Sequence, residues 1–341
     1  MKFNRAGASE KDALLFAKKS EDYMKKQVVM IIAVATVLWF SGPVLSGEAE
    51  WNDLCSRVQE NIKVGKLPDA EADAKKSLEY AEKTFGPDDT RTVKSLIVLG
   101  NIHKDQGNFE ESNTLLRKAL ILNEKRVGPD DPEVIESLNS LGSLLQVQNK
   151  ISEAEPLFRR ALDIDEKKPS KNRLPVAEVE ESLALLRANE GDFAQAAKLL
   201  EKAVMEREKS PSPESEDFAT CLNNLASIYA QQERYDDAVS LQEKALGILK
   251  KAAGPDTLAS ALFTQNLAGF LILSGKNEEA EVLLSSVPSI LEKNLGPQHP
   301  AVAEVLFELA ELNEQMGNSK KAEEFHKRAS ALQSNTQKQK P

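Results

Sequence analysis

Small and hydrophobic positions recur along the chain with a period of 42 residues. Three positions in each repeat carry a small or aliphatic residue almost throughout. The first set is Ala70, Ser112, Ala154, Ala196, Ala238, Ala280 and Ala322. Seven residues later come Ser77, Ala119, Ala161, Ala203, Ala245, Val287 and Ala329, and twelve residues before the first set stand Val58, Gly100, Gly142, Ala184, Ala226, Ala268 and Ala310. Because small residues let two helices cross closely, this pattern predicts a pair of packed helices in every repeat.

Turn residues separate the two helices of each pair. Five residues before the first set stand Gly65, Gly107, Asn149, Gly191, Glu233, Gly275 and Gly317. Glycine and asparagine tolerate the left-handed backbone that ends a helix, so a tight turn is predicted here, with Glu233 as the exception. An apolar residue usually follows two positions later, and it begins the second helix.

The repeats themselves are joined by linkers of the type "GPDD", as at 128–131. The glycine is expected to end one helix in a left-handed conformation, and Pro129 to prevent its continuation. Asp131 is predicted to cap the next helix and Pro132 to take its first position. Because the motif has one glycine and no following "GK[ST]", it is interpreted as a linker that ends one helix and begins the next, and not as a phosphate-binding loop. The linkers 167–175 and 208–217 lack the glycine and are expected to be looser.

One segment carries a family resemblance most fully: "LNNLASIYAQQERYDDAVSLQEKAL", residues 222–246. It resembles the signature of tetratricopeptide repeats, whose usual period is about 34 residues. The 42-residue period and the linkers resemble the kinesin light chain subgroup. HEAT repeats have a similar period but lack the three sets of small residues. The resemblance covers residues 51–332 and implies an all-α fold, a right-handed α-solenoid of about seven helix-turn-helix repeats.

The N-terminal region has a different pattern. Residues 24–49 begin with Lys25 and Lys26, continue as an apolar run from Val28 to Phe40, and end in small residues. This is the order of a secretory signal peptide. Two alternatives remain open, a cleaved signal and an uncleaved N-terminal membrane anchor. The protein would be periplasmic or secreted in the first case, and held to the membrane by one helix in the second. Residues 1–23 form a polar extension, with Met24 as an alternative start, and 333–341 a polar tail.

Charge narrows the range of partners. The formal net charge is −10, and because residues 1–47 have a balance of +3, the remainder carries −13. Such a surface repels the phosphates of nucleic acids and of anionic lipids. A partner protein or peptide is expected instead, basic or of mixed polar and apolar character. Membrane contact is expected only through the N-terminal segment.

Candidate catalytic chemistry is sparse. The histidines His103, His299 and His326 lie in different repeats without metal-ligand spacing, and His299 is predicted to cap the helix that begins at Pro300. Cys55 and Cys221 are four repeats apart, which excludes an intrachain disulfide in a stacked array. We therefore expect no metal, no cofactor and no enzymatic activity.

The resemblance implies a ligand groove lined by the first helix of each repeat. Polar residues at the family's ligand-contacting positions are Asn101, Asn139, Gln146, Glu181, Asn223 and Gln265. Beside them stand Asn224 and Asn266, with Asn189 and Gln231 at the ends of their helices. Amides both donate and accept hydrogen bonds, so a series of them spaced by one repeat suits the backbone of an extended peptide. The alternative is that they face water or brace the neighbouring repeat. Two alternatives are open for Ile97, Val147, Leu185, Phe263, Leu273 and Phe307, namely apolar patches near the groove and, for some of them, positions in the core.

The sequence therefore predicts a non-catalytic, exported protein-interaction scaffold that binds a partner in its concave groove. The alternative is an assembly factor of an envelope complex that acts through its convex face or by self-association.

Overall fold

A computed structural model describes residues 47–210 and 213–338, with side chains described as far as residue 333. The polar extension 1–23 and residues 24–46 of the predicted signal or anchor segment lie outside the described residues. None of the helices in the described residues is long and apolar enough to cross a membrane.

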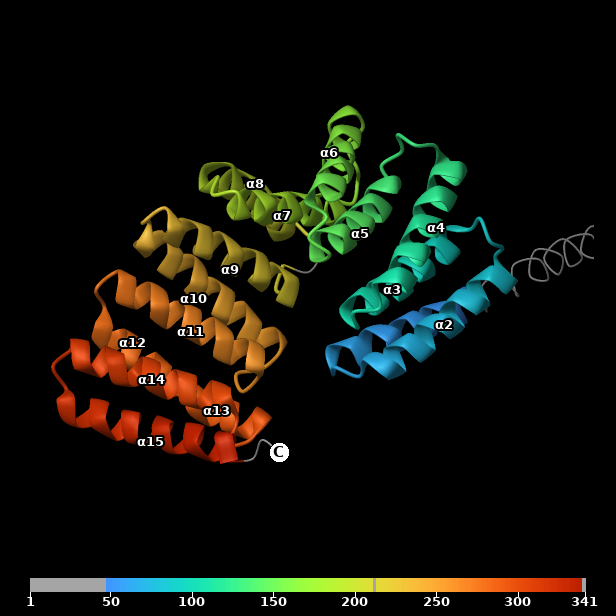
Figure 1. Cartoon of the computed structure of the whole chain (residues 1–341). Helices are drawn as coiled ribbons and strands as arrows, with labels where there is room; N and C mark the ends of the chain where they lie inside the picture. Colours follow the sequence, from blue (N-terminus) through green and yellow to red (C-terminus); the bar gives the residue numbers. More distant parts are fainter. Residues whose placement is uncertain (1–46, 211–212, 339–341) are drawn as a thin grey trace, which may run out of the picture. The chain divides into compact units, whose positions relative to one another are not determined.

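The described residues form α-helices joined by short turns, with no β-strand among them (Figure 1). The chain is helical from residue 47 to 63, and further helices follow in pairs. Their bounds are α2 Leu67–Thr84, α3 Thr90–Asp105, α4 Phe109–Val127, α5 Val134–Val147, α6 Ile151–Lys167, α7 Leu174–Asn189, α8 Phe193–Glu208, α9 Glu216–Gln231, α10 Tyr235–Ala252, α11 Leu258–Leu273, α12 Asn277–Leu284, α13 Val287–Leu295, α14 Pro300–Gln315 and α15 Ser319–Lys338. They make seven hairpins, each with a first helix (the A helix) and a second helix (the B helix). The predicted all-α solenoid of helix-turn-helix repeats is confirmed.

The 42-residue register is present in the structure. Each member of the first small-residue set is the fourth residue of its B helix, from Ala70 in α2 to Ala322 in α15. All three sets are buried in every repeat. The predicted turn residues all have positive φ, including the two that are not glycine, Asn149 at 60° and Glu233 at 61°. The helices therefore cross at the predicted positions, and the turn geometry is kept even where the sequence departs from glycine.

The linker glycines have positive φ. Gly128 has a φ of 94°, in agreement with the prediction, whereas Gly296, with φ 94° and ψ 154°, lies in an extended region that is open almost only to glycine. Asp131 does not cap α5, because Glu133 takes the N-cap position without a side-chain bond; the Asp131 carboxylate instead accepts a hydrogen bond from the Glu133 backbone N–H at 3.1 Å, within the linker. Pro132 does not take the first helical position, because α5 begins two residues later, at Val134. In the last linker Pro300 does begin α14, and His299 caps it through the Ala301 backbone N–H, as predicted.

The linker 167–175 is held by a buried carboxylate rather than being loose. Asp165 is 9% exposed, and it accepts hydrogen bonds from the Ser170 backbone N–H at 2.9 Å and from Arg173 Nη1 at 2.5 Å. Arg173 also lies 3.3 Å from Glu206 on α8. These bonds replace the glycine turn, so the expectation of a loose linker was wrong for this segment.

Two B helices differ from the expected lengths. In the sixth hairpin the B helix is divided into α12 and α13, because Pro288 has no N–H to bond the carbonyl four residues before it. Ser285 and Ser286 donate instead to the carbonyls of Glu281 and Leu283, both at 2.7 Å. In the last hairpin α15 extends to Lys338, so the first six residues of the expected tail are helical, in a segment without glycine or proline.

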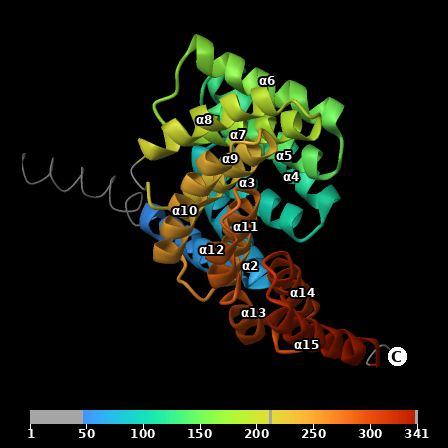
Figure 2. The same cartoon turned by 90° about the vertical axis from the view of Figure 1, so that its left-hand side faces the viewer.

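The described residues divide into two compact units, with the boundary between residues 119 and 120. In the first unit, Val58, Ala70, Ala74, Leu99 and Ile102 form a core. In the second unit each B helix from α6 to α10 packs against its own A helix and the next one, and α14 pairs with α15 (Figures 1 and 2). A continuous core runs from Phe218 on α9 to Ala329 on α15. Stacking therefore buries the apolar faces that one hairpin leaves open.

Candidate functional site

A pocket of about 540 Å³ lies between the A helices α11 and α14 in the second unit. We call it the α11–α14 pocket. It is lined by Leu262, Gln265, Asn266, Ala268, Gly269, Phe270, Ile272 and Leu273 of α11, by Leu284 of α12, and by Glu308, Glu311, Leu312 and Gln315 of α14. Its volume falls in the range of ligand pockets, and it includes two of the predicted groove residues, Gln265 and Asn266.

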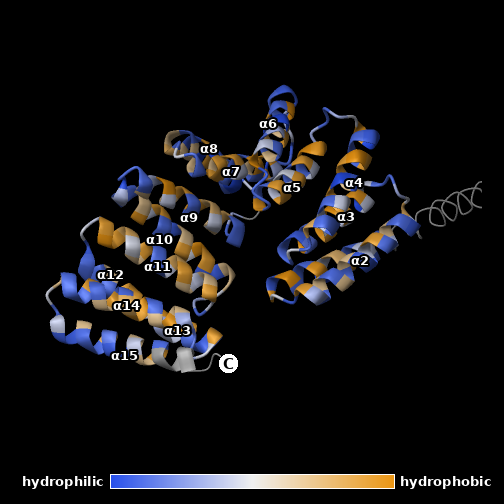
Figure 3. Ribbon diagram, in the orientation of Figure 1, coloured by the Kyte–Doolittle hydropathy of each residue, from blue (hydrophilic) through white to orange (hydrophobic). Residues whose placement is uncertain are grey.

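The α11 side of this pocket is apolar. Leu262 and Leu273 are 55% and 54% exposed, whereas Leu267 and Leu271 of the same helix are buried. Orange residues recur along α11 in Figure 3, whereas α15 is mostly blue or pale. Between these two leucines lies Gly269, where an added Cβ would meet no atom within 4 Å. Glycine in a helix interior costs about 1 kcal/mol relative to alanine, and packing does not require it here.

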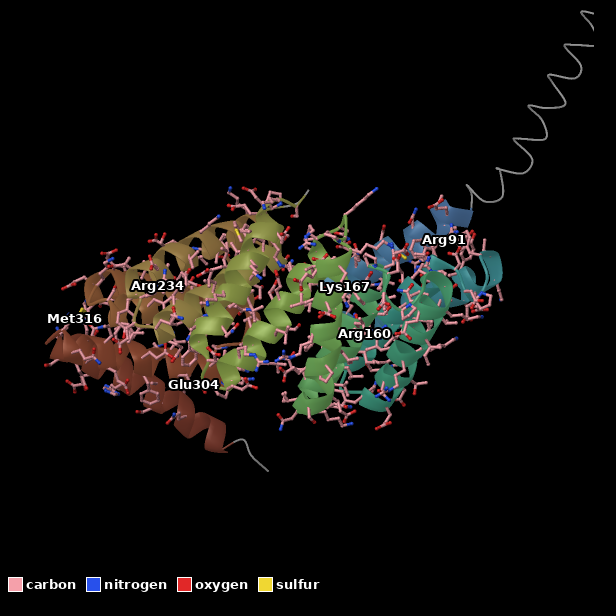
Figure 4. The ribbon with its side chains drawn as sticks, turned by 90° about the horizontal axis from the view of Figure 1, so that it is seen from above. Arg91, Arg160, Lys167, Arg234, Glu304 and Met316 are labelled. Atoms are coloured by element: carbon pink, nitrogen blue, oxygen red, sulfur yellow. The ribbon has the colours of Figure 1, made fainter. Side chains whose placement is uncertain are left out.

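The α14 side is acidic. Glu308 and Glu311 are exposed one turn apart, and Glu304, labelled in Figure 4, lies one turn before Glu308. Gln265 Nε2 donates to Glu308 Oε2 at 3.4 Å, and desolvation together with these neighbouring carboxylates raises the pKa of Glu308. Other acids of this region have basic partners: Glu281 with Lys321, Glu314 with His326 and Glu292 with Arg328. In the described part of the chain, none of Glu304, Glu308 and Glu311 has an ion-pair partner.

Several predicted groove amides bind the neighbouring repeat. Asn139 is 8% exposed, and its Nδ2 donates to Glu178 Oε2 at 3.0 Å. Gln146 Nε2 lies 3.5 Å from the Ser182 carbonyl oxygen, and Asn266 Nδ2 donates to Asn223 Oδ1 at 2.8 Å. Each bond spans between 36 and 43 residues, that is, one repeat. These three amides therefore link one A helix to the next.

Glu181 takes part in a buried ion pair. It accepts a hydrogen bond from Nε of Arg207, a residue of α8 that is 6% exposed, at 2.5 Å. Burial raises the pKa of Glu181 although Arg207 opposes the shift, and burial also raises the pKa of the neighbouring Cys221 thiol. The pair connects the two helices of the fourth hairpin, so the carboxylate of Glu181 has a structural partner within the chain.

The remaining predicted groove residues are dispersed. Asn189 and Gln231 are exposed at the C-terminal ends of α7 and α9, and Asn224 is half-buried on α9. Asn101 is half-buried on α3 in the first unit. Among the residues considered for apolar patches, Ile97 and Phe263 are core residues at 3% and 6% exposure, which is the second of the two alternatives. Val147, Leu185 and Leu273 are exposed.

The histidines and cysteines lie in separate elements of the fold. His103 is buried, and His326 lies beside Phe307 and 3.2 Å from Glu314. Both cysteines are free. Across the described ranges no group of three histidine, cysteine or acidic side chains has the arrangement of a metal site.

Sequence reasoning missed the residues that distinguish the α11–α14 pocket. Leu262, Gly269, Glu308 and Glu311 are not among the residues that the sequence predicted for the groove. The 42-residue register contains the signal. The equivalents of Leu262 are Lys94, Glu136, Glu178, Thr220 and Glu304, and those of Gly269 are Asn101, Ser143, Leu185, Ser227 and Glu311. An apolar residue followed by a glycine at these two positions occurs in the sixth repeat alone among these six.

Comparison with known proteins supports the fold assignment. The tetratricopeptide repeat profile matches residues 61–120, 96–167, 175–251 and 257–335. Comparison with curated proteins finds no match.

Solved structures provide further matches. BtubC (BKLC) from P. vanneervenii is 22% identical with a TM-score of 0.57, over 74% of this chain and 95% of that one. A putative kinesin light chain from Podosopora anserina is 22% identical with a TM-score of 0.50, over 60% and 96%. The Rap conjugation gene regulator of plasmid pLS20, solved in complex with the Phr* peptide, is 15% identical with a TM-score of 0.54, over 83% and 73%. With repeat matches along most of its length and kinesin light chain-like structures among those it resembles, this chain belongs to the tetratricopeptide repeat family.

Proposed function

We propose that this protein is a non-catalytic interaction scaffold that binds a segment of a partner protein along its A helices, with the α11–α14 pocket as the principal contact. The observation that carries the proposal is the pocket itself, since exposed Leu262 and Leu273 flank open space above Gly269. Contiguous apolar surface of this kind, bordered by polar groups, is typical of binding sites. The Rap regulator with its bound Phr* peptide is a precedent for a peptide ligand on a similar fold.

The pocket also offers a better test than the amides do. Alanine at Asn139 or Asn223 would remove a bond to the neighbouring repeat, so a loss of binding there would have two explanations. Gly269→Met instead places a side chain in the pocket without displacing another, because a Cβ added at Gly269 has no atom within 4 Å. Gly247→Met is its matched control, because Gly247 is also a glycine inside a helix, α10, with no atom within 4 Å of an added Cβ.

The experiment is a selection of random 12-residue peptides on the full-length protein, followed by affinity measurements on the selected peptides. We expect the wild-type protein and Gly247→Met to bind the selected peptides equally, and Gly269→Met to lose them. If no peptide is selected, or if Gly269→Met binds as tightly as the wild type, the pocket is not the binding site.

We also propose that the protein is exported, on the basis of residues 24–49, whose charged, apolar and small-residue order is that of a signal peptide. Sequencing the N-terminus of the mature protein tests this. A new N-terminus following Ser46, Gly47 or Ala49 would indicate a cleaved signal, an intact segment in the membrane fraction would indicate an anchor, and an intact segment in the cytosol would contradict export.

A further inference from the structure

We propose that the α11–α14 pocket takes a cationic peptide segment, which places one large apolar side chain over Gly269 and a lysine or arginine against Glu308 and Glu311. This inference rests on the proposed function and specifies the chemistry of the partner. It has two independent supports, the apolar side of the pocket and the acidic side.

The apolar side is specific to the sixth repeat. Leu262, Gly269 and Leu273 are spaced by seven and four residues and so lie on one face of α11. One repeat earlier the equivalent positions are Thr220, Ser227 and Gln231, and one repeat later they are Glu304, Glu311 and Gln315. These three positions are therefore polar in both neighbouring repeats, whereas in the sixth repeat they are two leucines and a glycine.

Gly269 has a different role from the other glycines of the A helices. Gly100 and Gly142 lie where helices cross, and an added Cβ there would lie 2.7 Å from Leu116 and 2.5 Å from Phe158, respectively. At Gly269 the same Cβ would point into open space. The missing side chain thus leaves room for an occupant rather than for a neighbouring helix, and an apolar group placed there would cover both exposed leucines.

The acidic side determines the charge of the occupant. Glu304, Glu308 and Glu311 lie on one face of α14 at spacings of four and three residues, where like charges repel one another. The rise in the pKa of Glu308 has this repulsion among its causes. A lysine or arginine of the partner would relieve the repulsion and supply the counter-charge that the described residues do not provide.

The same charges disfavour other occupants. An acidic peptide, a nucleic acid or an anionic lipid surface would add to the repulsion at Glu308 and Glu311. A second copy of this chain is disfavoured by its net charge of −10. A peptide of purely polar character would leave Leu262 and Leu273 uncovered. The combination of one large apolar residue with a nearby cation is the chemistry that satisfies both sides.

The test is the composition of the peptides selected above and their response to charge. We expect the selected pool to be enriched in lysine and arginine together with leucine, isoleucine, phenylalanine or methionine. Affinity should fall as salt is raised, and by about tenfold in the double variant Glu308→Gln/Glu311→Gln. The control is Glu278→Gln/Glu279→Gln on α12, a pair of exposed acids that do not line the pocket, and it should leave affinity unchanged.

The outcomes separate the two proposals. If Gly269→Met blocks binding but the pool shows no cationic enrichment, or if the glutamine double variant binds as the wild type does, the pocket is a binding site and the inference about a cationic partner is wrong. If Gly269→Met does not affect binding, the proposed function fails, and this inference fails with it.

Discussion

Gly142 of α5 lies directly against the ring of Phe158 on α6, so closely that a Cβ added at Gly142 would be 2.5 Å from Phe158 Cε1. Both residues are buried, and Phe158 has no exposed surface. One repeat later the equivalent positions hold Ala184 and Leu200. The larger residue on the B helix is thus paired with the smaller one on the A helix, so the total volume at this crossing is kept similar.

This pairing predicts a compensating exchange. Gly142→Ala should lower the free energy of unfolding by about 1–3 kcal/mol, because overpacking outweighs the gain in helix propensity. Phe158→Leu should also destabilise, by removing ring atoms from a full core. The double variant recreates the combination of Ala184 and Leu200. It should lose less stability than the sum of the losses in the two single variants.

Urea denaturation of the four proteins gives the coupling energy. Additive losses in the double variant would mean that the two residues do not constrain one another.

The register could be predicted from sequence because it depends on local requirements that repeat. A small residue is needed wherever two helices cross, which fixes Ala70 and its six equivalents, and positive φ is needed at each turn, which Asn149 and even Glu233 adopt. These requirements follow from backbone geometry and are the same in every hairpin.

The site could be predicted only in part, because its side-chain partners are individual to each repeat. Glu181 has the position of a groove residue, but it is bound by Arg207 from the B helix. No spacing in the sequence predicts that pair. Asp165 replaces a linker glycine by binding Arg173 and the Ser170 backbone. The α11–α14 pocket depends on an absent side chain at Gly269, and a glycine within a helical pattern has several meanings until its surroundings are known.

Gly247 and Gly269 should respond alike to alanine. Neither has an atom within 4 Å of an added Cβ, and both lie within helices, α10 and α11. Each substitution should raise the free energy of unfolding by about 0.5–1 kcal/mol, because alanine loses less backbone entropy than glycine on folding. Thermal and urea denaturation measure this. Destabilisation by Gly269→Ala alone would show that the position is packed, and would remove the open space on which the pocket proposal rests.

Arg207 should be essential to the stability of the fourth hairpin. Truncation by Arg207→Met leaves the Glu181 carboxylate without its buried partner, which we expect to cost roughly 3 kcal/mol. Adding Glu181→Gln should recover much of that loss, because it removes the unpaired charge at position 181. Lys244→Met is the surface control: the Lys244–Glu208 pair is exposed on both sides, and its removal should cost less than about 1 kcal/mol. Equal losses in the two single variants would contradict a special role for the buried pair.

Glu180 on α7 is a buried acid without full hydrogen bonding. It is 6% exposed, and its Oε2 has no hydrogen-bond partner among the described residues. Desolvation raises the pKa of Glu180 from 4.5 to about 7. Lys202 and Arg173 oppose the shift, whereas Glu206 and Asp165 add to it. Because the folded-state pKa lies above the unfolded one, the folded protein binds the proton more tightly. This contribution to stability is fully present below pH 4.5 and is lost as pH rises through about 7.

Glu180→Gln should therefore change the pH dependence of stability. The variant keeps a neutral polar group at every pH, so its free energy of unfolding relative to the wild type should rise by about 2–3 kcal/mol between pH 4.5 and pH 8. Carboxylates whose pKa values are lowered, such as Glu155 and Glu281, contribute stability that is lost as the pH falls. This contribution is the same in both proteins, so it cancels in the difference. Urea denaturation at several pH values measures it, with pH 4.5 as the internal reference. A difference that stays constant with pH would show that Glu180 ionises in the folded protein as it does in the unfolded chain.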